Sequence, residues 1–307
     1  MKKLLLAAEL PQEEVLRLKQ VFDIFQMPSN SSVLELLKGA NGANAVIIDQ
    51  HIKLEAPVIE ILAPTCNIIS VCGNDSKNID VITAAKKGIT VCFSDRPLTD
   101  AIADMIFALL FATGRKVIKG NEYVRLGRDR GYCPQSLLGT DVSLSTLGLI
   151  GGGAVSRALS TRAKAFNMKL LYASENEDNV LNSLGAKKVS LEDLLAFSDY
   201  ISLNSEYVLT KDKFNLTKKG SIILSAVDEN LLDEKALMNA LENEDISAAA
   251  LDVYTKQNLL ELKKHENCIL TPKMGSATEK KRNMLINDAI KNVMDYYDGK
   301  EVNAAIK

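Results

Sequence analysis

The sequence is poor in several residue types on which catalysis, metal binding or secretion often depend. It contains no Trp and only two His among 307 residues, His51 and His265, and we expect both to lie in exposed loops. The cysteines are odd in number and never spaced as CxxC, which argues against a disulfide framework and a zinc site and favours a reducing cytosol. These cysteines are Cys66, Cys72, Cys92, Cys133 and Cys268.

A large net charge and long apolar runs are also lacking. The formal net charge is only -2, so the chain has no long-range attraction for nucleic acid or for an anionic membrane. No stretch reaches the roughly 20 apolar residues that span a bilayer. The opening run LLLAA is too short for a signal peptide, and we interpret it as a strand. We expect a soluble, cytoplasmic protein without nucleic-acid or membrane partners.

Short apolar runs alternate with helical patterns in two series along the chain. The first series ends near residue 97 and the second begins near residue 141. This order is typical of βα units in a parallel sheet, and 307 residues with 47% hydrophobic content suffice for two cores. We therefore expect an α/β protein with two Rossmann-like parallel-sheet domains, one flavodoxin-like and one doubly wound, with a cleft between them.

A helix and an irregular arm are expected between the two series. The helix starts near Pro97, where Thr99 or Asp100 could cap it, and residues 101–117 give a broad apolar stripe that ends in basic residues. Residues 120–140 carry Gly, Arg and Tyr without a clear period. They predict an irregular arm of the kind that often mediates contacts between subunits.

A glycine-rich turn joins an apolar strand to a helix at residues 147–156. Gly151 and Gly153 occupy the first two positions of a GxGxxG pattern, and Ser156 stands at the third. The first glycine allows a tight turn, and the second lets a pyrophosphate approach the backbone amides and the helix dipole. The same turn could equally be a simple bend between strand and helix, so the motif alone leaves both interpretations open.

The glycine-rich segment and several others resemble the D-isomer-specific 2-hydroxyacid dehydrogenases, in particular their glyoxylate and hydroxypyruvate reductase branch. The resemblance implies a discontinuous substrate (lid) domain of residues 1–97 and 275–307. It also implies a dinucleotide-binding Rossmann domain of residues 98–274, with a dimerisation arm at 117–140, and a homodimer. The segments that carry it are LGLIGGGAVSRALSTRAKAFNMKLLYAS, NIDVITAAKKGITV, PLTDAIADMIFALLFATGRK, LLGTDV, KKGSIILS, LLDEKALMNAL, AAALDVY and ILTP.

The resemblance also assigns the positions of the catalytic side chains. Reducing a 2-oxo acid requires a cation for the substrate, a proton donor and a carboxylate that tunes the donor; the family uses Arg, His and Glu. At the Arg position this chain has Asp228, at the Glu position Thr255, and at the His position, within Thr-Pro-Lys, Lys273. All three side chains therefore differ from the family pattern.

Cofactor positions are altered as well, although NAD or NADP binding is still possible. Ser174 stands where the family usually has an acidic residue for the ribose hydroxyls. The family's HxP is replaced by residues 204–206, which place Glu206 near the expected path of the cofactor. Thr99 and Asp252 are retained, and Asp252 would contact the nicotinamide carboxamide.

The substrate loop keeps one glycine of a GxG pair. Gly73 is retained and is followed by Asn74, whereas Asp75 replaces the second glycine. Because this loop offers backbone amides to a substrate carboxylate in the family, Asp75 adds a negative charge where an anion should bind.

Three hypotheses follow for the function. The chain is a catalytically inactive pseudoenzyme with a binding or structural role, or it is an active oxidoreductase with Lys273 as proton donor, or it is a non-catalytic dinucleotide sensor. For the second hypothesis, Asp228 and Asp75 favour a neutral or cationic substrate such as an imine or an aldehyde. A salt bridge between Lys273 and Asp228 that closes an unused pocket is the alternative explanation for that pair.

Overall fold

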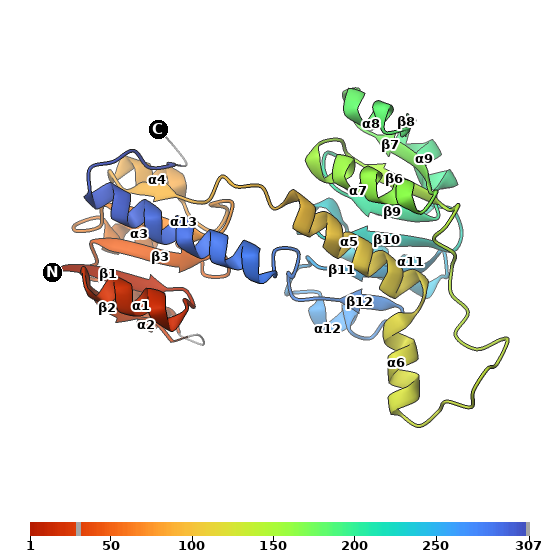
Figure 1. Cartoon of the computed structure of the whole chain (residues 1–307), viewed down its shortest axis with the longest axis horizontal. Coiled ribbons are helices and arrows are strands. Elements are labelled where there is room, and N and C mark those ends of the chain that lie inside the picture. Colours follow the sequence, from red (N-terminus) through yellow and green to blue (C-terminus); the bar gives the residue numbers. More distant parts are fainter. Residues whose placement is uncertain (29–31, 305–307) are drawn as a thin grey trace. The chain divides into compact units, whose positions relative to one another are not determined.

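A computed structural model describes residues 1–28 and 32–304 (Figure 1). The chain forms two compact units. The first unit combines Met1–Pro97 with Thr278–Lys307, and the second unit is Leu98–Ala277. The return of the chain to the first unit thus falls at Thr278, whereas the sequence placed the boundary at residue 275.

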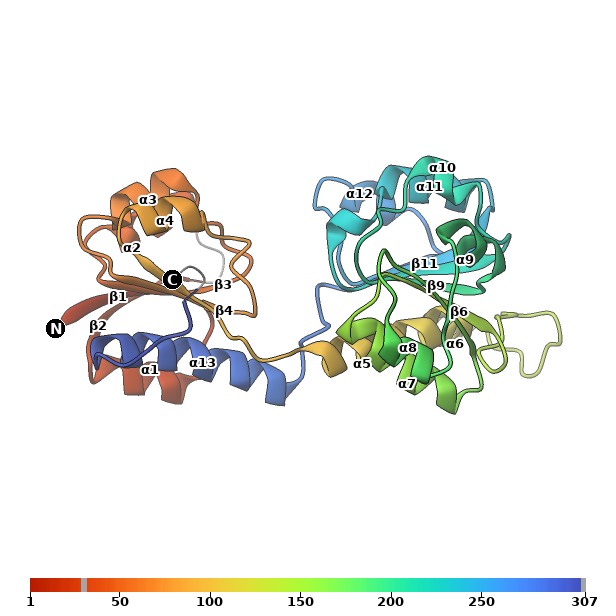
Figure 2. The same cartoon turned by 90° about the horizontal axis from the view of Figure 1, so that it is seen from above.

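The first unit is built on a five-stranded parallel sheet in the order β2-β1-β3-β4-β5. Its strands are rich in Leu, Ile and Val, and the side chains of Leu4, Leu5 and Ile47 are fully buried. Helices α2, α3 and α4 cover one face, and α1 and α13 cover the other (Figure 2). The bounds are β1 (Lys2–Ala7), α1 (Gln12–Lys19), β2 (Phe22–Gln26), α2 (Val33–Ala40), β3 (Ala45–Asp49), α3 (Ala56–Leu62), β4 (Ile68–Cys72), α4 (Val81–Lys86), β5 (Thr90–Cys92) and α13 (Glu279–Tyr297).

The second unit is built on a seven-stranded sheet in the order β12-β11-β10-β9-β6-β7-β8, again with every adjacent pair parallel. The apolar sides of α5 and α7 pack on one face, and those of α9 and α11 pack on the other. The bounds are α5 (Thr99–Gly114), α6 (Val117–Arg125), β6 (Thr146–Ile150), α7 (Ala154–Ala165), β7 (Lys169–Ala173), α8 (Asn179–Ser183), β8 (Lys187–Lys188), α9 (Leu191–Phe197), β9 (Tyr200–Leu203), α10 (Lys211–Phe214), β10 (Ser221–Ser225), the 3-10 turn η1 (Glu229–Leu231), α11 (Glu234–Glu242), β11 (Ile246–Leu251), α12 (Leu259–Leu262) and β12 (Cys268–Leu270).

The predicted fold class of two parallel-sheet domains is confirmed, but the segment between the two series differs from the prediction. The long helix does not continue through residue 117, because Lys116 has a left-handed φ of 52° and a second helix, α6, begins at Val117. The first part of the predicted irregular arm is therefore helical. Gly120 lies inside α6, and a glycine there costs only about 1 kcal/mol of helix stability. Residues 126–145 contain no helix or strand.

The predicted cap of α5 was also wrong. The N-cap residue is Leu98, whose apolar side chain cannot cap the helix. Asp100 instead lies 3.3 Å from the guanidinium of Arg162 on α7. This ion pair ties α5 to α7 rather than closing the helix end.

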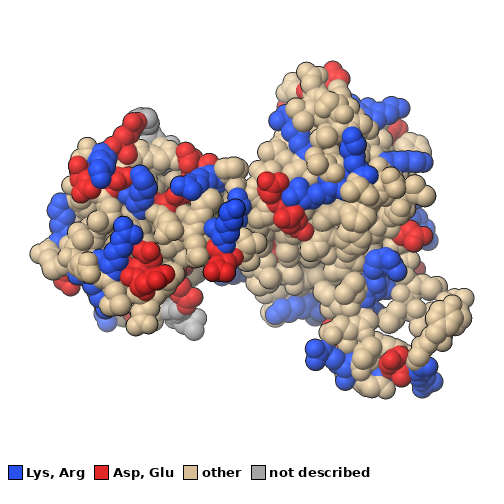
Figure 3. Space-filling view, in the orientation of Figure 1, with Lys and Arg blue, Asp and Glu red and all other residues tan. Residues whose placement is uncertain are grey.

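The surface carries both signs of charge. Lys and Arg side chains are intermingled with Asp and Glu over the face seen in Figure 3. Within the described residues, no helix is long and apolar enough to cross a bilayer. In the same part of the chain, no group of three His, Cys, Asp or Glu side chains is placed to hold a metal ion.

Candidate functional site

The glycine-rich turn lies between β6 and α7 and needs glycine at two positions. Gly151 and Gly153 have φ values of 92° and 88°, which other L-residues rarely adopt. A Cβ atom on Gly151 would also lie only 2.1 Å from the Oγ of Ser205. The turn therefore has the backbone shape that the sequence motif predicts.

Ser156, at the third motif position, is buried and holds the turn together. Its Oγ donates a hydrogen bond of 2.6 Å to the carbonyl of Gly151 and accepts one of 2.9 Å from the Nδ2 of Asn204. The hydroxyl of Ser202 donates in turn to the Oδ1 of Asn204 at 3.0 Å. This buried network fixes the start of α7 against the end of β9.

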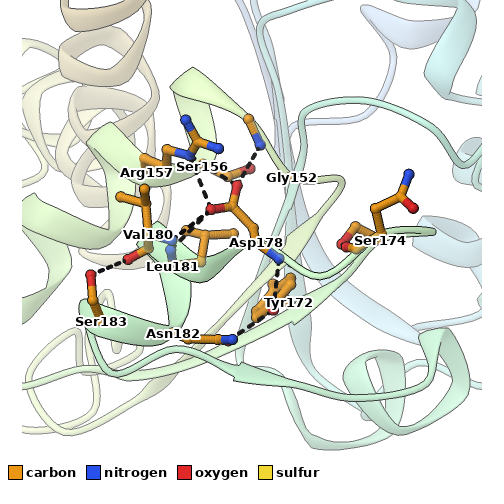
Figure 4. Close-up of polar contacts among 12 residues, drawn as sticks. Gly152, Ser156, Arg157, Tyr172, Ser174, Asp178, Val180, Leu181, Asn182 and Ser183 are labelled. Carbon is orange, nitrogen blue, oxygen red and sulfur yellow. Dashed lines mark hydrogen bonds and ion pairs between the residues drawn. The ribbon is translucent and has the colours of Figure 1, made fainter.

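Asp178, the N-cap residue of α8, places its carboxylate at the glycine turn. Its Oδ2 accepts a hydrogen bond of 3.2 Å from the backbone amide of Gly153, and its two oxygens lie 2.9 and 3.0 Å from the Nε of Arg157 on α7. Figure 4 shows this carboxylate pointing toward Arg157 and the turn. The amides of Val180 and Leu181 donate to its Oδ1 at 3.0 and 3.1 Å.

The charge state of Asp178 follows from these donors. Burial alone raises the pKa of its carboxyl, but the hydrogen bonds from Arg157 and from the amides of Leu181 and Gly153 outweigh that effect. The net result is a pKa below the ordinary value for Asp. A buried anion thus lies against the start of α7 at neutral pH.

A second carboxylate, that of Glu206, reaches the same turn from the loop after β9. Its Oε2 accepts a hydrogen bond of 2.8 Å from the amide of Glu175, and its Oε1 lies 3.5 Å from the amide of Gly152. Glu206 has a left-handed φ of 70° and an exposed side chain. Its carboxylate spans the ends of β6 and β7.

These contacts decide how well a dinucleotide fits. The amides of Gly152 and Gly153, which would face a pyrophosphate, already face Glu206 and Asp178. Ser174, at the ribose position, is buried and donates its hydroxyl to the carbonyl of Asn176 at 2.5 Å. The turn has the right shape for a dinucleotide, but the side chains around it do not fit one.

The three positions that the resemblance assigns to catalysis follow adjacent strands of the sheet. Asp228 comes after β10, Thr255 after β11 and Lys273 after β12, so the structure brings them to one edge of the second unit. Asp228 is half-buried and caps η1, where its Oδ1 accepts hydrogen bonds of 3.0 and 2.8 Å from the backbone and side-chain amides of Asn230.

Thr255 belongs to a buried hydrogen-bond cluster around Glu234. Its amide and hydroxyl donate to the two carboxylate oxygens of Glu234, each at 2.6 Å, and the Nδ2 of Asn258 donates to the Oε2 at 2.6 Å. Only 3% of Glu234 is exposed. Glu234 was not among the site residues predicted from the sequence, although an acidic residue after Asp233 at a helix start is a recognisable signal.

Asp252 orders the turn that carries Lys273. Its carboxylate accepts hydrogen bonds of 2.6 Å from the hydroxyl of Thr271 and of 2.7 Å from each of the amides of Met274 and Gly275. Lys273 has a left-handed φ of 54° and is exposed. Thr99, the other retained position, is the half-buried first residue of α5.

The remaining predicted site residues lie in the first unit. Gly73 is buried, and a Cβ there would lie 2.5 Å from the side chain of Gln50. Asn74 is half-buried beside it. Asp75 accepts a hydrogen bond of 3.0 Å from the amide of Lys77, so its carboxylate stabilises its own loop.

The two histidines have different surroundings. His51 is exposed and pairs with Asp49 at the rim of a pocket of about 530 Å³ in the first unit, which Glu9 and Arg282 also line. Burial raises the pKa of the Asp49 carboxyl, although His51 lowers it in part. The expected exposure of His265 was wrong, because only 13% of its side chain is accessible and its Nε2 lies 3.9 Å from Glu242.

Comparison with known proteins places the chain among enzymes of one family. Residues 107–275 match the family model described as D-isomer specific 2-hydroxyacid dehydrogenase, NAD binding domain. The chain is 33% identical to a glyoxylate reductase from Pyrococcus horikoshii over 97% of this chain and 93% of that protein. The chain belongs to the D-isomer specific 2-hydroxyacid dehydrogenase family.

A second sequence relative and a solved structure give similar results. A glyoxylate reductase from Thermococcus kodakarensis is 31% identical over 97% of this chain and 93% of its own length. The crystal structure of the TT0316 protein from Thermus thermophilus superposes with a TM-score of 0.88 at 29% identity, covering 99% of this chain and 100% of that one. The matched NAD-binding domain implies NAD(P) binding, which contrasts with the carboxylates at the glycine turn.

Proposed function

We propose that this family member does not reduce 2-oxo acids and instead keeps the dehydrogenase scaffold for a binding or structural role. The observation that carries the proposal is the charge at residue 228, where the family's substrate-binding Arg is replaced by Asp228. Two unit charges about 4 Å apart interact by roughly 4 kcal/mol at an effective dielectric constant of 20. Replacing attraction by repulsion of that size would weaken oxo-acid binding by several powers of ten.

The other two positions support the same proposal. Thr255, at the Glu position, serves as a donor to the buried Glu234 and carries no carboxylate. Lys273, at the His position, carries an ammonium group in place of an imidazole, and the proton donor that works near neutral pH is most often a histidine. This exchange of side chain weighs against the alternative of an active oxidoreductase with Lys273 as proton donor.

Steady-state assays of the purified protein test the proposal. Glyoxylate and hydroxypyruvate are each offered with NADH and with NADPH, and the absorbance of the reduced nicotinamide is followed. The glyoxylate reductase from Pyrococcus horikoshii, assayed in the same buffer, is the positive control. We expect no turnover above the rate without protein, while circular dichroism shows that the chain is folded.

An imine and an aldehyde are offered in the same assay to address the alternative. Turnover of any of these substrates that Lys273→Ala abolishes would overturn the proposal. Residual turnover that survives Lys273→Ala would point to a contaminating reductase and is checked by repurification with a second tag.

A further inference from the structure

We propose that Asp178 and Glu206 are built-in anionic ligands of the glycine turn, so that a dinucleotide binds only by displacing Glu206. This inference concerns cofactor binding and goes beyond the proposed lack of catalysis. Such displacement would explain why the turn has the backbone shape for a dinucleotide although carboxylates already face its amides.

The turn offers groups that bind anions. Backbone amides and the helix dipole at the start of a helix favour a negative charge, and a Rossmann fold uses them for the pyrophosphate. In this chain the amide of Gly153 donates to Asp178, and the amide of Gly152 faces Glu206 at 3.5 Å. Internal carboxylates therefore already face the backbone amides that a pyrophosphate would need.

Asp178 is the fixed member of the pair. It is buried, it caps α8 through the amides of Val180 and Leu181, and it pairs with Arg157. Removing it from the turn would break all of these contacts. The cation beside the turn, Arg157, is thus already partly neutralised by Asp178 and has less positive charge to offer a pyrophosphate.

Glu206 is the displaceable member. Its side chain is exposed, and it accepts hydrogen bonds from the amides of Gly152 and Glu175. These amides lie at the ends of β6 and β7, between which the pyrophosphate and the adenosine ribose of a dinucleotide lie in this fold. The carboxylate of Glu206 therefore competes with the cofactor for space and adds repulsion toward its phosphates.

Titration calorimetry with NADH, NADPH and ADP tests the inference in the full-length protein. The variants are Glu206→Gln, which removes the charge and keeps the size, and Glu206→Gly, which removes the side chain and suits the left-handed φ of 70°. Glu192→Gln is the control, because Glu192 is exposed on α9 and its loss changes the net charge by the same amount.

We expect both Glu206 variants to bind at least one dinucleotide about tenfold or more tightly than the unmodified chain, which corresponds to about 1.4 kcal/mol. The control should leave the affinity unchanged. Equal affinities in the unmodified chain and both folded Glu206 variants would overturn the inference, as would an unmodified chain that already binds in the micromolar range. A Glu206 variant that binds the cofactor but still reduces no substrate would support both proposals, whereas turnover would contradict the proposed function alone.

Discussion

At the scale of single residues, the side chain of Asp178 joins the glycine turn, α7 and α8. Its carboxylate is buried and accepts hydrogen bonds from Arg157 and from three backbone amides. We predict that Asp178→Asn lowers the free energy of unfolding at pH 7 by about 1.5–3 kcal/mol, the usual contribution of hydrogen bonds to a charged group. Asn still caps a helix, so α8 should persist. Urea titration measures the loss.

The pH dependence gives the same prediction a second readout. Because the pKa of Asp178 in the folded chain lies below its ordinary value, its contribution to stability is complete above the unfolded pKa of about 3.9 and is lost as the pH falls through the folded pKa. The stability difference between the chain and Asp178→Asn should therefore shrink on acidification below about pH 4. Asp193→Asn is the control, because Asp193 is exposed in the first turn of α9 and its loss should lower the free energy of unfolding by less than about 1 kcal/mol. A constant difference across this range would contradict the assignment.

The sequence predicted part of this residue-scale picture. Gly151, Gly153 and Ser156 were predictable because a GxGxxG pattern after an apolar strand specifies a local backbone shape. The placement of Glu206 near the cofactor path was predictable from the family resemblance alone. The role of Asp178 was not, because its contact with Gly153 joins residues 25 positions apart and depends on how α8 packs beside α7.

At the scale of elements, Glu234 joins the start of α11 to the loop after β11 through Thr255 and Asn258. We predict that Thr255→Glu, which introduces the residue type of the family's catalytic position, destabilises the chain by several kcal/mol, on the order of 3–5. The new carboxylate would lie against the buried carboxylate of Glu234 and would disturb two of its hydrogen bonds. Chemical denaturation with urea measures the effect.

The matched control for this prediction is Thr255→Ser. Serine keeps the hydroxyl that donates to Glu234, so its cost should stay below about 1.5 kcal/mol, as for loss of a methyl group. If Thr255→Glu proved as stable as Thr255→Ser, the cluster around Glu234 would tolerate the catalytic carboxylate, and Thr255 would not be needed for its stability.

The order of the larger elements was predictable because apolar runs and helical periods mark each βα unit. The break between α5 and α6 was not predicted, although Gly114 followed by Arg115 and Lys116 is a recognisable helix-end signal within residues 101–117. The left-handed backbone at Lys116 ends the first helix. Short elements such as β8 were also missed, since Lys187 and Lys188 carry no apolar signal and pair with β7 through backbone contacts.

At the scale of the whole molecule, we propose that the chain forms a homodimer through the arm of residues 117–140. The arm exposes large apolar side chains, with 63% of Leu126, 94% of Tyr132 and 58% of Leu138 accessible. Exposed apolar residues scattered singly are common on protein surfaces, whereas several within one irregular segment favour an interface. The family resemblance implies a homodimer through the same arm.

The dimer proposal predicts a change of mass on charging the arm. The double variant Leu126→Glu and Leu138→Glu should sediment as a monomer while the unmodified chain sediments as a dimer, because carboxylates buried without partners in an interface cost several kcal/mol. Leu260→Glu on α12 is the control, since this leucine is 74% accessible and lies outside the arm. A monomeric unmodified chain would refute the dimer. A double variant that stays dimeric would instead place the interface elsewhere on the chain.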